Sequence, residues 1–273
     1  MKVMLLSSAE PIQISLLRKV LAENLDTKWI VFDSYGKTNS FKFRLVTVLK
    51  RIIFFSTDAS WFAMMAKFRK ELSGVSISPD LIVSDINDER VLQTIRYNKP
   101  ELVVVSGTNL LKRNLIWEIR QHGEVINLHT GLSPYVNGGP NCTNWCLYNR
   151  DYHLIGTTVM FINEGIDSGD IIASSTLDLK SFSRLKDLHI ELIKLSHKLL
   201  LEVIRKFKNR DKLSKIRQDT MQIKTKTFYT RQWNFWHSFI AWRNFYKLQF
   251  VKRFRRERIF YDVCTVPVRV EPK

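Results

Sequence analysis

The sequence predicts an α/β protein with a mostly parallel, Rossmann-like sheet, helices on both faces of the sheet, and a small, basic, aromatic-rich C-terminal region. Short apolar runs typical of buried strands alternate with segments of helical periodicity, which is the order that builds a parallel sheet. Residues 102–105 are apolar at every position and precede a turn at Gly107, as in a strand buried on both faces. The 273 residues, 45% of them hydrophobic, can also bury a sizeable core.

The expected elements alternate along the chain as this fold requires. Residues 11–24 are expected to form a helix, because Pro11 suits a first helical position and apolar residues recur at helical spacing. The other expected helices lie at residues 87–98, 110–121, 141–149 and 183–207, and the expected strands at residues 3–6, 29–32, 81–85, 100–107, 125–129, 156–162 and 171–177. We expect a main domain at residues 1–205 and a small subdomain at residues 206–273.

Two segments combine basic and aromatic residues. Residues 34–76 suit either a helical face with lysines at its edges or an insertion that faces a substrate. Between residues 205 and 258, 17 Lys and Arg stand against three acidic residues, among many aromatic side chains. Three hypotheses fit this tail: a subdomain packed on the main one, a face for an anionic nucleotide or polynucleotide, or a basic amphipathic helix that associates weakly with an anionic membrane surface.

The overall charge and the cysteine content narrow the class of protein. A net charge of +17 indicates anionic partners such as nucleotides, nucleic acid, polyglutamylated folate or a membrane surface. Three cysteines form no disulfide framework, and Cys142 and Cys146 lack a second ligand pair, so we expect no metal site. Residues 3–6 are too short for a signal peptide and no apolar run is long enough to span a membrane, so the expected location is cytoplasmic. Residues 7–10 lack the glycines of a dinucleotide or phosphate-binding loop.

The polar residues with most chemical information lie at the ends of two expected strands. Asn127 and His129 stand two apart, so on a strand their side chains leave from the same face. A glycine- and proline-rich loop follows them, and the turn at residues 163–169 carries Asp167. Ligands in open α/β sheets bind at the carboxyl ends of strands, so we expect these side chains to converge there.

This pattern resembles the formyltransferase family that uses 10-formyltetrahydrofolate. The Asn127-x-His129 pair, the Ser-Pro-Tyr135 loop with its glycines, and Ile-Asp167-Ser-Gly-Asp-Ile about 40 residues later carry the resemblance, which spans roughly residues 101–178. It implies an N-formyltransferase with 10-formyltetrahydrofolate as co-substrate and no metal. Members of the family are often dimers, so it also implies a homodimer.

The resemblance assigns a role to each residue of the motif. Histidine exchanges protons near neutral pH, so His129 is expected to accept a proton from the attacking amine, with Asp167 orienting its ring. The Asn127 amide is expected to stabilise the negative charge that develops on the formyl oxygen. The implied folate contacts are Ser106, Gly107, Thr108, Asn109, Leu110, Asn163 and Glu164, and the implied substrate contacts are Tyr135, Asn141 and Asn144. We expect Trp145 to pack beneath the substrate loop, and His189 and His197 to lie at the surface or the edge of the core.

The loop after His129 is most similar to those of the nucleotide-sugar N-formyltransferases. Residues 135–145 lack the basic residues and the Trp-Arg-Gly-like run usual in the methionyl-tRNA enzyme. The expected acceptor is therefore an amino-deoxysugar on a nucleoside diphosphate, used in bacterial surface polysaccharide such as the O-antigen of lipopolysaccharide. The alternatives are a methionyl-tRNA formyltransferase-like enzyme, formylation of another small amine, and a folate- or nucleotide-binding protein without turnover.

Overall fold

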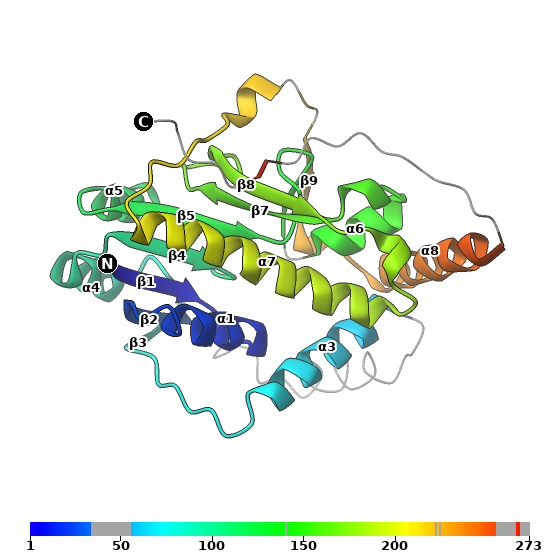
Figure 1. The fold of residues 1–273 in the computed structure, drawn as a ribbon, viewed down its shortest axis with the longest axis horizontal. Helices are drawn as coiled ribbons and strands as arrows, with labels where there is room; N and C mark the ends of the chain where they lie inside the picture. Colours follow the sequence, from blue (N-terminus) through cyan, green and yellow to red (C-terminus); the bar gives the residue numbers. More distant parts are fainter. Residues whose placement is uncertain (34–55, 140, 222, 224, 255–265, 268–273) are drawn as a thin grey trace.

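The computed structural model describes residues 1–33, 56–139, 141–221, 223, 225–254 and 266–267 (Figure 1). Its centre is a seven-stranded sheet in the order β3-β2-β1-β4-β5-β7-β8. The strands are β1 (Lys2–Ser7), β2 (Asp26–Phe32), β3 (Leu81–Val83), β4 (Leu102–Ser106), β5 (Glu124–His129), β7 (Gly156–Phe161) and β8 (Ile171–Thr176). The first five run parallel, and β7 lies antiparallel to both β5 and β8. The predicted mostly parallel α/β sheet is confirmed.

Helices cover both faces of the sheet, as predicted. One face carries α1 (Pro11–Leu21) and α7 (Leu185–Lys208), and the other carries α4 (Glu89–Asn98) and α5 (Arg113–Arg120) (Figure 1). Successive side chains of a strand point to opposite faces, so Leu5 joins the first apolar core and Met4 the second. Both side chains are fully buried, which is why the strand is apolar at consecutive positions.

The strand register brings the carboxyl ends of the central strands to one edge. Ser7 of β1 pairs with Ser106 of β4, and Val105 pairs with Asn127 of β5. His129, the last residue of β5, pairs with Thr158 of β7. The loops after β1, β4 and β5 therefore open at the same edge of the sheet.

The C-terminal part of the described chain packs on a helix and a short strand of the segment that follows β5. Helix α8 (Phe235–Phe254) lies on α6 (Cys142–Asn149), and Phe245 is fully buried between them and the start of α7. The short strands β6 (Val136–Gly138) and β9 (Lys226–Phe228) pair in parallel. Trp145 of α6 stacks on Phe228 at 4.8 Å between ring centroids, so the expectation that it packs beneath the loop is confirmed.

Some details differ from what the sequence indicates. Residues 34–55 of the basic, aromatic segment lie outside the described residues, and residues 57–71 form α3 (Thr57–Glu71), whose Phe68 is buried against α1 and α7. His189 and His197 do not lie at the surface, because α3 covers the face of α7 that carries them and leaves each at most 3% exposed. Strands β6 and β9 have three residues each, too few for a recognisable pattern. No helix in the described part of the chain is long and apolar enough to cross a membrane.

Candidate active site

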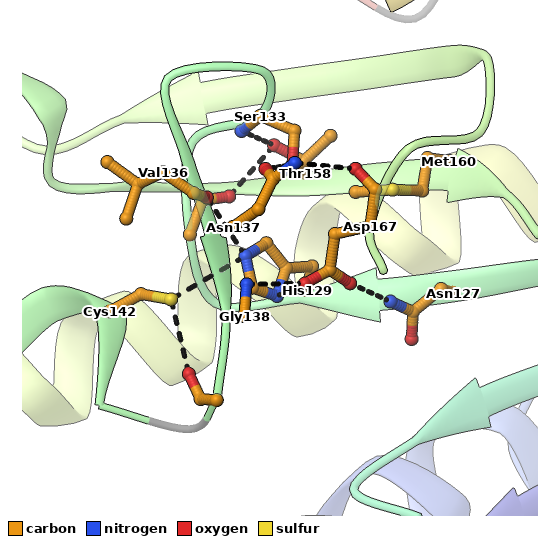
Figure 2. A network of polar contacts seen from close by, with 12 residues as sticks. Asn127, His129, Ser133, Val136, Asn137, Gly138, Cys142, Thr158, Met160 and Asp167 are labelled. Atoms are coloured by element: carbon orange, nitrogen blue, oxygen red, sulfur yellow. Dashed lines mark hydrogen bonds and ion pairs between the residues drawn. The ribbon is translucent and has the colours of Figure 1, made fainter. Parts of the chain in front are cut away.

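Asp167 connects the other two motif residues through its carboxylate. Oδ1 accepts a hydrogen bond from Nδ2 of Asn127 at 3.0 Å, and Oδ2 lies 3.5 Å from Nδ1 of His129 (Figure 2). The backbone N–H of Gly138 also donates to Oδ2, at 2.8 Å. The His129 and Asp167 side chains are only 8% and 10% exposed, whereas Asn127 is half-buried. The structure therefore brings together the three residues that the sequence motif contains.

The loop around β6 encloses the His129 ring. Nε2 lies 3.2 Å from the Val136 carbonyl oxygen and 3.8 Å from the Cys142 sulfur. A neutral imidazole can donate to only one of its two oxygen neighbours, whereas an imidazolium donates to both. If His129 gains a proton, both of its N–H groups can therefore donate, to the Val136 carbonyl and to the Asp167 carboxylate. Gly131 is required beneath the ring, because a Cβ there would overlap Nε2.

Threonines of β7 fix the end of β5. Thr157 Oγ1 donates to the His129 carbonyl at 2.9 Å, and Thr158 Oγ1 donates to the Gly131 carbonyl at 2.9 Å. Both hydroxyl groups are buried. The backbone on either side of His129 is therefore anchored where the strand ends and the loop begins.

The Asp167 backbone has an uncommon conformation that its neighbours hold. Its φ of +47° lies in the left-handed region, which non-glycine residues rarely adopt. The Asp167 carbonyl accepts from Nδ2 of Asn137 at 3.1 Å and from Nε2 of Gln218 at 2.9 Å. Gln218 also donates to the Gly169 carbonyl at 2.7 Å. The turn that presents the carboxylate is thus fastened from two directions.

The residues predicted to contact folate lie on two loops at the carboxyl edge. Ser106 is buried at the end of β4, and Gly107, Thr108, Asn109 and Leu110 follow it with at least partial exposure. An ion pair of 3.1 Å between Arg113 and Glu164 connects this loop with the one that carries Asp167. Asn163 instead serves its own turn, accepting from the Gly165 N–H and the Ser168 hydroxyl. The two loops thus meet beside the motif, with exposed surface that a co-substrate can reach.

The residues predicted to contact substrate differ in their accessibility. Tyr135 and Asn141 are half-buried. Asn144 is 5% exposed, and its Oδ1 lies 3.0 Å from Nε2 of His189, so its carboxamide is engaged inside the protein. Burial lowers the pKa of His189 to about 4. The contact is therefore one between a neutral histidine, which donates, and the amide oxygen, which accepts.

The cysteines near the site are protonated thiols in a buried environment. Burial raises the pKa of Cys142 well above its usual value and that of Cys146 in the same direction. The Cys142 thiol donates to the Gly139 carbonyl at 3.2 Å. Within the ranges that the structure describes, no group of three His, Cys, Asp or Glu side chains is placed to hold a metal ion.

Two contributors to the site were not predicted from the sequence. Gln218 donates to the Asp167 turn from 51 residues further along the chain, and no local sequence pattern predicts this contact. Gly138 donates to Asp167 and has a φ of +111°, and a Cβ there would overlap the Phe228 carbonyl of β9. The paired glycines of the loop were visible in the sequence, but their contact with a later strand was not.

Comparison with known proteins identifies the family. A family profile described as formyl transferase matches residues 50–204, more than half of the chain. The chain belongs to the formyl transferase family. The chain is also similar to the methionyl-tRNA formyltransferase of Flavobacterium psychrophilum, with 30% identity over 142 residues, which are 52% of this chain and 44% of that protein. The match thus spans less than half of the length of that relative.

Solved structures share the fold over a larger part of both chains. The chain superimposes on a sugar N-formyltransferase from Shewanella sp. FDAARGOS_354 with a TM-score of 0.57 and 15% identity, covering 90% of this chain and 87% of that one. It also superimposes on WlaRD, a sugar 3N-formyl transferase crystallised with dTDP and 5-N-formyl-THF, with a TM-score of 0.53 and 12% identity over 90% and 79% of the two chains. At such identities the likeness establishes the shared fold.

Proposed function

We propose that this protein transfers a formyl group from 10-formyltetrahydrofolate to the amine of a nucleotide-linked amino-deoxysugar. The observation that carries the proposal is the Asp167 carboxylate, which contacts both Asn127 and His129 at the carboxyl end of β5. An acid, an imidazole and a carboxamide in contact supply the groups that acyl transfer to an amine requires. Family membership makes the formyl group the acyl group in question.

The three side chains divide the chemistry between them. As the substrate amine bonds to the formyl carbon, the carbonyl oxygen gains negative charge, and the free N–H of the Asn127 amide donates to it. His129 takes the proton that the amine nitrogen loses, and Asp167 together with the Val136 carbonyl stabilises the resulting imidazolium. The bond between the formyl carbon and N10 of the folate then breaks, and the proton held by His129 is available to the departing nitrogen.

The extent of the matches supports a sugar nucleotide as the acceptor. The superposition on the sugar N-formyltransferase covers 87% of that chain, whereas the match to the methionyl-tRNA enzyme covers 44% of that protein. WlaRD contains dTDP and a formylated folate, so the shared fold holds both kinds of ligand in that enzyme. Under this proposal the product serves surface polysaccharide synthesis, such as that of O-antigen, and the enzyme works in the cytoplasm.

A methionyl-tRNA acceptor is the second candidate, because the curated relatives carry that name and share up to 32% identity with this chain. The net charge of +17 would suit a polyanionic substrate. The loop at residues 135–145, which lacks the basic run usual in that enzyme, favours the sugar.

The test is a turnover assay with 10-formyltetrahydrofolate and a panel of acceptors. The panel contains 3-amino and 4-amino deoxysugars on thymidine, uridine and guanosine diphosphates, and methionyl-tRNA as the rival. We expect rapid formylation of one sugar nucleotide, detected as a mass increase of one formyl group. Turnover with methionyl-tRNA alone would refute the sugar acceptor and favour the second candidate. No turnover with any acceptor would refute both candidates.

A further inference from the structure

Helix α8 carries large aromatic side chains on its outward face as well as on the inward face that packs on α6. Its 20 residues make it about 30 Å long. Ser238, Ala241 and Phe245 are fully buried on the inward face. The outward face carries Trp236, Phe239, Ile240, Arg243, Lys247 and Phe250, which recur at helical spacing; we call this set the outward stripe. A surface helix normally turns polar side chains outward, so the stripe is not adapted to water alone.

The exposed ends of the outward stripe are large aromatic side chains. Trp236 is 67% exposed and Phe250 is 66% exposed, and they stand 14 residues apart, which is about 21 Å along one side of the helix. Arg243 and Lys247 lie between them and are also exposed. Figure 1 shows α8 at one end of the molecule, away from the sheet. Two aromatic anchors in line with two cations form a linear, accessible surface.

The charge of this region decides the chemistry of the partner. No Asp or Glu occurs between residues 220 and 256, so the positive charge of α8 has no acidic neighbour in the sequence. Two copies of the stripe facing one another would bring like charges together without compensation, which disfavours self-association through it. Each cation of the stripe would instead strengthen the binding of an anionic partner.

We propose that the outward stripe of α8 docks on an anionic membrane surface. Helices that lie in a membrane interface combine Trp and Phe, which enter the boundary of the acyl chains, with Lys and Arg, which meet the phosphate headgroups. Trp236 and Phe250 can enter a flat boundary together because they project from the same side of a straight helix. Nucleic acid would instead stack its bases on a continuous run of neighbouring rings, whereas the exposed rings of α8 stand at its two ends, Phe235 and Trp236 at one and Phe250 at the other, with the cations between them.

Vesicle flotation with the full chain tests the proposal without any substrate. We expect binding to vesicles of phosphatidylcholine with about one third phosphatidylglycerol, weakened by salt, and little binding to phosphatidylcholine alone. Replacing Trp236 and Phe250 by Ala should weaken binding at least about tenfold, because two large apolar side chains no longer leave water. R243Q/K247Q should weaken it by about fivefold per cation.

The matched control is Trp117→Ala on α5, because Trp117 is 60% exposed but lies outside the stripe. This variant should bind as the unaltered protein does. Equal binding by W236A/F250A and W117A would overturn the proposal, as would failure to bind anionic vesicles at low salt. Release of bound vesicles by a single-stranded RNA, with tighter binding of that RNA, would also overturn it and assign the stripe to nucleic acid.

A second inference concerns Gln218 and rests on the proposed function. Beyond α7, the chain returns to the edge of the sheet, where Ile216 and Ile171 exchange two backbone hydrogen bonds of 2.8 and 2.9 Å. That bridge places Gln218 against the turn of the catalytic carboxylate, where its amide donates to the carbonyls of Asp167 and Gly169. Both N–H groups of one side-chain amide are used within a single turn.

We infer that Gln218 is a positioning residue that holds the Asp167 turn in its left-handed conformation. Its loss removes one of the two side-chain donors to the Asp167 carbonyl and its donor to the Gly169 carbonyl, in a backbone that is unfavourable for aspartate, so the carboxylate departs from the geometry that orients His129. Misplacement of a catalytic group lowers the rate of the chemical step more than it changes substrate binding. The C-terminal region thereby contributes to catalysis without touching the reacting atoms.

Amide hydrogen exchange tests this inference without reference to turnover. Gln218→Ala should speed exchange in residues 165–170, whereas Gln121→Ala, an exposed glutamine elsewhere, should not. If the proposed function holds, Q218A should also lower kcat about 10- to 100-fold with little change in KM. Unchanged exchange in residues 165–170 would overturn the inference, while faster exchange in a protein that formylates no acceptor would refute only the proposed function.

Discussion

The polar trio of Asn127, His129 and Asp167 and the aromatic layer that α6 forms with β9 and the segment before α8 are stabilised by different forces. Asn127, His129 and Asp167 form a few polar contacts at fixed distances, each made to another functional group or to the backbone. In the aromatic layer, Trp145 stacks on Phe228 and meets Trp233 edge to face, with centroids 4.8 and 4.9 Å apart. The geometry of the first region is set by directional hydrogen bonds, and that of the second by the close packing of large side chains.

This difference predicts different consequences for substitutions. Removing one polar atom from the trio should change the chemistry and leave the fold, because the remaining groups are near solvent or bonded to the backbone. Removing a ring from the aromatic layer should change the free energy of unfolding, because a cavity remains. The following predictions separate the two regions, beginning with the largest expected effect.

Loss of the imidazole or of the carboxylate charge should nearly abolish turnover. His129→Ala and Asp167→Asn each remove proton transfer or its support, and we expect kcat to fall about 100- to 10,000-fold. The melting temperature should remain close to that of the unaltered protein. Near-normal turnover in either variant would show that the residue has no role in the mechanism, and would contradict the distinction between the two regions.

Truncation of Phe245 should reverse this pattern. The side chain is fully buried, so Phe245→Ala should lower the free energy of unfolding by about 3–5 kcal/mol, measured by urea denaturation. Phe250→Ala on the same helix is the control, because that ring is 66% exposed and its loss should cost less than about 0.5 kcal/mol. Equal losses in the two variants would show that α8 is not packed as described.

Removal of the Asn127 amide should lower turnover less than removal of His129. An oxyanion donor typically contributes about 100- to 1,000-fold in kcat, and Asn127→Ala should fall in that range. Asn127→Asp is a sharper version, because it replaces the donor by a second carboxylate beside Asp167. A lower kcat in the aspartate variant than in the alanine variant would support the assignment, and equal activity of Asn127→Asp and the unaltered enzyme would contradict it.

Acidification should destabilise the fold through two buried histidines of α7. Burial lowers the pKa of His189 to about 4, and burial together with the charge of Lys19 lowers that of His197 to about 3. The unfolded chain binds protons at these groups below about pH 6.5 and the folded chain does not, so stability is complete above that pH and falls as the pH is lowered.

Each of these histidines should contribute a slope of up to about 1.4 kcal/mol per pH unit in that window. Urea denaturation at a series of pH values between these limits measures the slope, and it should flatten in His189→Asn and His197→Gln even where the absolute stability is also lower. An identical slope in the double variant would show that other groups bind the protons.

The sequence revealed the sheet and the motif because both have local signatures. The apolar run of β4 and the spacing of Asn127 and His129 depend on neighbours within a few residues. The burial of His189 was not predictable in this way, because α3, more than 100 residues earlier in the chain, covers it. The contact between Asn144 and His189 escaped prediction for the same reason, since it joins two helices that are separate in the sequence.

The sequence by itself determined the order of the strands of the main sheet and of most helices between them, the family resemblance, and the Asn127, His129 and Asp167 motif, because periodicity and short motifs are properties of adjacent residues. Only the tertiary structure decided that Asp167 contacts both partners, that Gln218 donates to its turn, and that α8 buries Phe245 while Trp236 and Phe250 are exposed. These facts depend on how distant segments meet. Contacts between distant segments are determined by the packing of the whole chain around its core, and a local sequence pattern does not predict them.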